Sequence, residues 1–142
     1  MDIQAKQEKI IREFEVLQDW PERYKHIIKV GSRMPPLPES DKVSENLIKG
    51  CQSQVWLTAH LEDNKIFYKA DSDAAITKGL VAMMVGFYSG HDPETILETA
   101  PSFIEKIGMA QHLSPTRANG LASMVKQMKI YAMAFRSKQT LS

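Results

Sequence analysis

Cys51 is the only cysteine of this 142-residue chain and its strongest candidate for chemistry. It stands in the stretch LIKGCQSQVWL, after Gly50 and before a run with the alternation of a β-strand. Glycine suits a turn, and the polar residues Gln52, Ser53 and Gln54 indicate a junction between loop and strand. Such junctions often carry reactive groups, although free cysteines are also among the most buried residue types. The context therefore favours a reactive thiol over an inert core residue.

A single thiol is compatible with three kinds of chemistry. A hydrolase or acyl transferase needs a base beside the thiol, and none of the four histidines stands in a recognisable nucleophile motif. A dithiol redox protein needs a second cysteine, which this chain lacks. A carrier that holds sulfur as a persulfide needs only one thiol and a docking surface, so it fits best. Lys49 would modestly favour the nucleophilic thiolate form of Cys51.

Other charged residues give weaker indications. No His-x-x-x-His pair or His/Cys cluster is present, so we expect no metal site. Asp71 and Asp73 precede an expected helix, where we expect Ser72 or Asp73 to cap the helix rather than the two carboxylates to form an acid/base pair. Arg117 falls in the first turn of another expected helix, where a cation opposes the helix dipole. This mismatch indicates a partner for Arg117, either an internal carboxylate or another protein, with a solvated arginine as an equal alternative.

The helices and strands that must position these residues are predicted from the spacing of apolar residues and from the glycines and prolines that interrupt it. Apolar spacing predicts a helix over residues 3–17 and a second from Asp19, with Trp20, Tyr24, Ile27 and Ile28 facing inward and Gly31 at its end. The stretches SQVWLTAHLED and IFYKA predict an antiparallel hairpin after a proline-rich loop. A nearly all-apolar segment, DSDAAITKGLVAMMVGFYSG, predicts a buried central helix that Gly90 closes.

Helices also dominate the C-terminal part of the chain. Two short helices each begin at a proline, and a long one starts at SPTR with Ser114 as its cap. In that last helix the expected inward stripe is Ala118, Leu121, Val125, Met128, Ala132 and Phe135. We therefore expect one α+β domain over residues 1–142, a small antiparallel sheet packed against several helices, with residues 1–9 and 137–142 frayed.

Composition narrows the class of protein. The chain has 18 basic and 17 acidic residues, a net charge of +1, which gives no support to nucleic-acid binding. No apolar run approaches the roughly 20 residues that span a bilayer, and the N-terminus lacks the apolar core of a signal peptide. We therefore expect a cytoplasmic protein that does not engage membranes.

Three motifs in register resemble the SufE family of sulfur-acceptor proteins. They are GCQSQVWL around Cys51, ADSDAAITKGLVAMMVGFYSG from Ala70 and AQHLSPTRANGLASM from Ala110. The earlier WPERYKHIIKVGSRMPPLP fits as well, so the resemblance runs from about Ile10 to Phe135 in the same order. Together these motifs are far more specific than a Gly-Cys pair alone.

The resemblance implies a role in iron–sulfur cluster biogenesis and a fold similar to the IscU-type scaffold. Cys51 would take persulfide sulfur from a SufS-type cysteine desulfurase, stimulate that enzyme and pass the sulfur to a SufBCD-type scaffold complex. The desulfurase would use pyridoxal phosphate, whereas this chain would bind no cofactor. A cluster needs about four thiolate-type ligands, so one cysteine does not support cluster binding here. A paralogous acceptor that serves another desulfurase has a related sequence.

The mechanism expected from this resemblance needs a mobile loop. Gly50 would be its hinge, Gln52, Ser53 and Gln54 would line it, and Asp73 and Arg117 would supply contacts that hold or release it. Two alternatives stay open: a stand-alone cysteine hydrolase or transferase with a perturbed histidine beside Cys51, and an interaction module in which Cys51 is inert. The sequence also leaves open whether Cys51 is exposed at rest, and whether the chain is a monomer or a homodimer.

Overall fold

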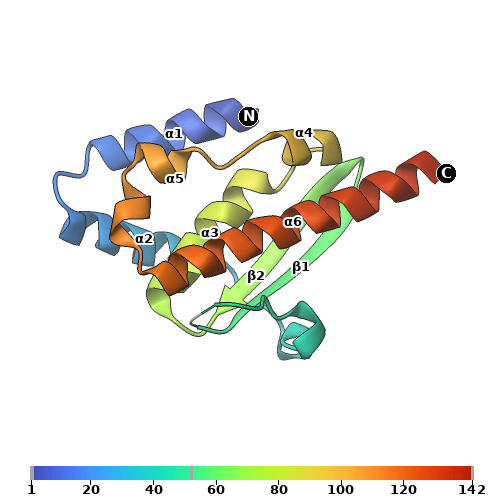
Figure 1. The fold of residues 1–142 in the computed structure, drawn as a ribbon, viewed down its shortest axis with the longest axis horizontal. Coiled ribbons are helices and arrows are strands. Elements are labelled where there is room, and N and C mark those ends of the chain that lie inside the picture. The colour runs from blue at the N-terminus through green and yellow to red at the C-terminus, as the bar shows by residue number, and fades with distance from the viewer. Residues whose placement is uncertain (1, 52, 142) are drawn as a thin grey trace.

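A β-hairpin and a helix packed behind it organise the chain (Figure 1). The structure is a computed structural model that describes residues 2–51 and 53–141. Its helices and strands are α1 (Ile3–Glu15), α2 (Trp20–Arg33), β1 (Val55–Glu62), β2 (Lys65–Ser72), α3 (Ala75–Tyr88), α4 (Pro93–Glu98), α5 (Phe103–Lys106) and α6 (Pro115–Leu141). Single 3-10 turns lie at 39–41 and 44–46 in the proline-rich segment and at 109–112 before α6. The α+β class expected from the sequence, with a small antiparallel sheet, is confirmed.

The hairpin keeps one register along its length. β1 and β2 pair antiparallel from Val55 opposite Ser72 to Glu62 opposite Lys65. Asp63 and Asn64 form the turn with φ of 51° and 64°, a backbone region that Asp and Asn tolerate better than other non-glycine residues. β2 continues beyond the predicted stretch IFYKA, which brings its last residues beside the start of β1.

Helix α3 is the central helix that its composition predicts. More than half of its residues are buried: Thr77, Gly79, Leu80, Val81, Met83, Met84, Phe87 and Tyr88. It packs against α2 and β2 and also contacts α1 and α6. A left-handed Gly90, with φ of 84°, follows its end as expected.

The crossing of α2 over α3 corrects two predictions. Gly31 does not end α2, which continues to Arg33; it packs against Gly79, where a Cβ on Gly31 would lie 2.7 Å from the Gly79 nitrogen. Two glycines that face each other let the helix backbones approach more closely than side chains would allow. Ile28 is 40% exposed and does not face inward, whereas Ile27 is fully buried. The buried face of α2 is thus narrower than the set of apolar residues predicted to face inward.

Helix α6 runs lengthwise beside the hairpin and contacts β1, α3 and α4 (Figure 1). Ser114 caps it by accepting from the Arg117 amide at 3.2 Å, as predicted. Its fully buried side chains are Met124, Met128 and Ala132, while Ala118, Leu121, Val125 and Phe135 of the expected stripe are half-buried. The buried positions of α6 therefore recur every four residues, rather than at alternating spacings of three and four.

The N-terminal helix is tied to the rest of the molecule by polar contacts. Asp2 caps α1 through the Ala5 amide, and the buried Gln7 accepts a hydrogen bond from the Phe103 amide at 2.7 Å. Lys6 donates to the carbonyls of Gly86 and Ser89 at the end of α3, each at 2.8 Å. Helix α1 from Ile3 and helix α6 to Leu141 thus include most of the two segments expected to fray. None of the described helices has the length and apolar character needed to cross a bilayer.

Candidate functional site

The loop that carries Cys51 is anchored on both sides. Before it, the Ile48 amide donates to the Val55 carbonyl at 2.8 Å, and Leu47 forms an antiparallel bridge with Trp56. Residues 47–48 therefore run beside residues 55–56 at the start of β1. The chain reverses direction in the loop that joins these two segments. Gly50 has φ of 86°, in the left-handed region, which is the turn geometry that its position predicts.

After the loop, Gln54 and Asp73 are joined by two hydrogen bonds. The Gln54 amide donates to the Asp73 carboxylate at 3.0 Å, and the Asp73 amide donates to the Gln54 carbonyl at 3.3 Å. This pair extends the β1–β2 ladder by one step past Val55 and Ser72. Asp73 therefore braces the Cys51 loop and does not cap α3, whose N-cap residue, Ala74, has no side-chain capping bond. The capping interpretation of Asp73 is wrong because the carboxylate lies within reach of β1.

The Cys51 thiol lies against the first turns of α6. The side chain is half-buried, and its sulfur lies 3.7 Å from the Gly120 carbonyl oxygen, to which the thiol can donate. A Cβ on Gly120 would lie 3.0 Å from the sulfur and 3.1 Å from the Cys51 Cα, so a side chain here would press on the loop. Sequence reasoning missed Gly120. The available signal was a glycine inside a well-formed helix, which costs about 1 kcal/mol relative to alanine and needs a packing or functional reason.

A small cavity adjoins the thiol. It measures about 20 Å³, room for roughly one water molecule or one sulfur atom. Its walls come from the loop, β1, α3 and α6 and are mostly apolar; they include Cys51, Ser53, Leu80, Arg117 and Leu121. The structure thus brings Ser53 and Arg117 to Cys51, while Gln54 and Asp73 stand at the anchor of the loop. Gln52 lies outside the described residues.

Arg117 is the charged member of this cavity wall. Its Nε is buried and has no hydrogen-bond partner within the described part of the chain. A buried donor without an acceptor is unfavourable by about 1–3 kcal/mol, so such a group needs an explanation. Neither an internal carboxylate nor free solvent meets this nitrogen in the described part of the chain, whereas the third expected environment, another protein, stays a prediction.

The electrostatic environment keeps the resting thiol neutral. Burial raises the pKa of Cys51, because the thiolate loses its hydration there. The expectation that Lys49 favours the thiolate is not met: the pKa shift has the opposite sign, and Lys49 is exposed. None of the four histidines, all of them described, is among the cavity-lining residues. His91, whose pKa burial lowers, pairs with Ile66 at the other end of β2.

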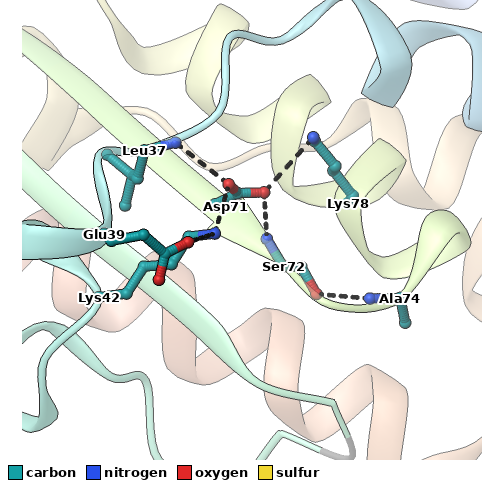
Figure 2. A network of polar contacts seen from close by, with 7 residues as sticks. All are labelled: Leu37, Glu39, Lys42, Asp71, Ser72, Ala74 and Lys78. Carbon is teal, nitrogen blue, oxygen red and sulfur yellow. Dashed lines mark hydrogen bonds and ion pairs between the residues drawn. The ribbon is translucent and has the colours of Figure 1, made fainter.

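Beside the loop anchor, Asp71 forms the centre of a buried polar network that the sequence did not suggest (Figure 2). Its carboxylate accepts from the Leu37 amide at 3.1 Å and the Ser72 amide at 2.8 Å. The ammonium groups of Lys42 and Lys78 each lie 3.4 Å from it. Asp71 therefore joins the proline-rich segment, β2 and α3.

The protonation state of Asp71 follows from these partners. Burial alone would raise its pKa, but the amides of Ser72 and Leu37 and the charges of Lys78 and Lys42 outweigh burial and lower it. Asp71 is therefore ionised across the neutral range and carries a negative charge between two cations. No group of three or more His, Cys, Asp or Glu side chains suited to a metal ion occurs within residues 2–51 and 53–141.

Comparison with known proteins identifies relatives over most of the chain. The model of the SufE family, described as an Fe-S metabolism associated domain, matches residues 8–132. An uncharacterised SufE-like protein of Synechocystis sp. is 40% identical over 132 residues, which cover 93% of this chain and 83% of that protein. A second uncharacterised SufE-like protein, from Rhizobium meliloti, is 40% identical over 127 residues, 86% of this chain and 91% of its own.

A solved structure shares the fold. The solution structure of a hypothetical protein from Thermus thermophilus superposes with a TM-score of 0.75 and covers 91% of this chain and 94% of its own. The sequence identity is 20%, so this likeness concerns the arrangement of helices and strands alone.

Proposed function

Because this chain belongs to the SufE family, which is associated with iron–sulfur metabolism, we propose that it is a sulfur carrier with Cys51 as the acceptor. The observation that carries the proposal is the setting of Cys51. Its thiol lies on a short loop anchored at both sides and adjoins a cavity of about 20 Å³, the size of one additional sulfur atom. One thiol with space for one more sulfur atom suits temporary storage of that atom.

The transfer is an exchange at sulfur. The Cys51 thiolate attacks the terminal sulfur of a partner's cysteine persulfide, and the bond between the partner's two sulfurs breaks. Cys51 becomes the persulfide, and the partner's cysteine leaves as a thiolate. The proton lost from Cys51 goes to solvent or to that leaving thiolate, and no outside oxidant or reductant is needed.

The resting position of Cys51 supports transfer inside a complex rather than in free solution. A half-buried, neutral thiol is a poor nucleophile, so the loop has to turn outward before it reacts. Gly50 is the natural hinge, and the contacts at Gln54 and Asp73 keep the far side of the loop fixed while it moves. Docking would thus activate Cys51 by exposing it to solvent or to the partner's charges.

The partners follow from the same proposal. The donor would be a SufS-type cysteine desulfurase that uses pyridoxal phosphate and that this chain would stimulate by removing its persulfide. The receiver would be a SufBCD-type scaffold complex, and both exchanges would take place in the cytoplasm. The cluster itself would form on the scaffold, since this chain offers one cysteine.

A stand-alone hydrolase or transferase has less support from the site. Such an enzyme needs a base within hydrogen-bond distance of the thiol. The charged group at the cavity is Arg117, which cannot accept a proton, and the described cavity-lining residues include no histidine. An inert Cys51 is disfavoured by Gly120, because the absence of a side chain there makes room for the loop and thiol.

Mass spectrometry of the intact protein tests the proposal directly. Incubation with a SufS-type desulfurase and L-cysteine should add one sulfur atom to Cys51, and a reductant should remove it. Cys51→Ser should gain no sulfur and should not raise the desulfurase rate. A wild-type protein that stays at its original mass, or a Cys51→Ser variant that stimulates the desulfurase fully, would contradict the proposal.

A further inference from the structure

The sulfur-carrier proposal raises a question of charge. A persulfide S–H is more acidic than a thiol, so a loaded Cys51 would be largely an anion near neutral pH. An anion in a mostly apolar cavity is strongly disfavoured unless a charged or hydrogen-bonding partner meets it. The empty thiol is neutral and needs no such partner, so the requirement arises only when sulfur is bound.

Arg117 has the properties of that partner. It lines the same cavity as Cys51, it carries a permanent positive charge, and its buried Nε–H has no acceptor in the described chain. Its position in the first turn of α6 is electrostatically unfavourable for a cation, which a bound anion would offset. We infer that Arg117 is the counter-ion of the Cys51 persulfide and holds its terminal sulfur through the Nε–H. This inference rests on the proposed function.

The geometry distinguishes the loaded from the empty state. Burial is the cause of the raised pKa of the empty thiol, and no charge from Arg117 counteracts it. The terminal sulfur of a persulfide would lie about 2 Å beyond the present one, the length of a sulfur–sulfur bond. The added atom would therefore occupy the cavity that Arg117 lines.

The remaining charges near the loop do not duplicate this role. Lys49 is exposed on the loop itself, and Asp73 is engaged with the Gln54 amide. Lys126 lines a separate groove together with Lys49. The residues that α3 and β1 contribute to the cavity, including Thr77, Leu80 and Val55, are uncharged.

The test measures two acidities on chemically loaded protein. The full chain is treated with inorganic polysulfide, from which the Cys51 thiolate takes one sulfur atom and leaves the polysulfide one atom shorter. Alkylation by iodoacetamide across pH then gives the midpoint for the persulfide, and the same titration on untreated protein gives the midpoint for the thiol. The masses of the two products distinguish alkylated persulfide from alkylated thiol.

Substitutions at Arg117 should separate the two midpoints. In Arg117→Met and Arg117→Gln the persulfide midpoint should rise by about one to two pH units, since a charge-assisted hydrogen bond is lost. Arg117→Lys keeps the charge without the Nε–H and should show a smaller rise. The thiol midpoint should stay nearly unchanged in all three. Lys126→Met, which removes an exposed cation from the same helix, is the matched control and should change neither.

Three results would overturn the inference. They are a persulfide midpoint unaffected in both Arg117→Met and Arg117→Gln, equal shifts of the thiol and persulfide midpoints, and a Cys51 that takes no sulfur from polysulfide even above the thiol midpoint, where the thiolate is present. Loading here needs no desulfurase, so a failure of the carrier role and a failure of the role of Arg117 give different results. A desulfurase that fails to load Cys51 would contradict only the carrier role, and an unshifted midpoint only the role of Arg117.

Discussion

At the scale of single residues, the site depends on what surrounds the thiol more than on the thiol itself. The sequence identified Cys51 and the turn at Gly50, because both have local signatures. It placed Arg117 at a helix start but could not show that its Nε is buried and lacks an acceptor in the described chain. Gly120 stayed unnoticed, since its importance arises from a loop that is distant in sequence and close in space.

The raised pKa of Cys51 gives the first prediction. Alkylation of the empty protein should follow a pH profile whose midpoint lies above about 8.5, the value of an ordinary thiol, because burial disfavours the thiolate. The measurement is the rate of iodoacetamide modification between pH 6 and about 10, compared with that of the chain unfolded in urea. A folded-state midpoint at or below that of the unfolded chain would contradict the burial argument.

Gly120 gives the second prediction. In Gly120→Ala the new methyl group would press on Cys51, so the loop should shift outward and alkylation should become several times faster. Gly86→Ala is the matched control, because Gly86 lies within α3 with open space at its Cβ position. That control should gain about 0.5–1 kcal/mol of stability and leave the reactivity of Cys51 unchanged. Equal reactivity in the two variants would show that Gly120 does not position the loop.

At the scale of elements, packing and register were easier to predict than the roles of polar side chains. The hairpin, the buried helix α3 and the cap of α6 follow from periodicity and local residue types. Asp71 does not, because its partners come from two other parts of the chain, Leu37 and Lys42 from the proline-rich segment and Lys78 from α3. Gly31 has the local signature of a helix end, and only its tertiary contact with Gly79 explains why the helix continues.

The network around Asp71 predicts a pH-dependent stability. Asp71→Asn should lower the free energy of unfolding by about 3 kcal/mol, because it leaves two cations without their shared carboxylate. Since folding lowers the pKa of Asp71, its contribution is complete above the ordinary carboxyl pKa of about 3.9 and is lost as the pH falls through the folded value. The difference between wild type and variant should therefore shrink in acid. Urea unfolding at several pH values measures it.

An exposed carboxylate serves as the control for that experiment. Asp63 lies in the hairpin turn, where asparagine accepts the same positive φ. Asp63→Asn should change stability by less than about 0.5 kcal/mol. A similar small effect of Asp71→Asn at neutral pH would mean that the network contributes little.

The helix crossing gives a further prediction at this scale. A methyl group in Gly79→Ala would overlap the Ile27 carbonyl of α2, and backbone atoms cannot move aside as a flexible side chain can. We expect a loss of about 1–3 kcal/mol or more in the free energy of unfolding, measured by urea titration. Gly86→Ala on the same helix is again the comparison, and the expectation fails if both variants are equally stable.

At the scale of the whole molecule, helices and a hairpin form a packed frame beside the Cys51 loop. The α+β arrangement could be predicted because helices and hairpin each have a strong periodic pattern. The relation between the Cys51 loop and α6 could not, because nothing in either segment specifies which surface the other covers. The proposed function depends on that relation, since it determines when the thiol is available.

Hydrogen exchange tests this division of the molecule. The amides of α3 should exchange with a protection close to the global free energy of unfolding, since the helix is buried on nearly all sides. The amides of residues 49–51 and 53 should exchange through a local opening that is several kcal/mol less costly. Protection of the loop equal to that of α3 would contradict a loop that moves before global unfolding.

The two anchors of the Cys51 loop also limit how far the Cys51 sulfur can move toward a sulfur donor. Cys51 is three residues from Ile48 on one side and three from Gln54 on the other, and both are held by backbone hydrogen bonds. Three extended residues span about 10 Å at most. A donor whose sulfur lies deeper than that below its own surface cannot be served by this loop alone. Such a donor would have to carry its sulfur outward on a mobile segment of its own. Each protein would then cover part of the distance between the two sulfur atoms.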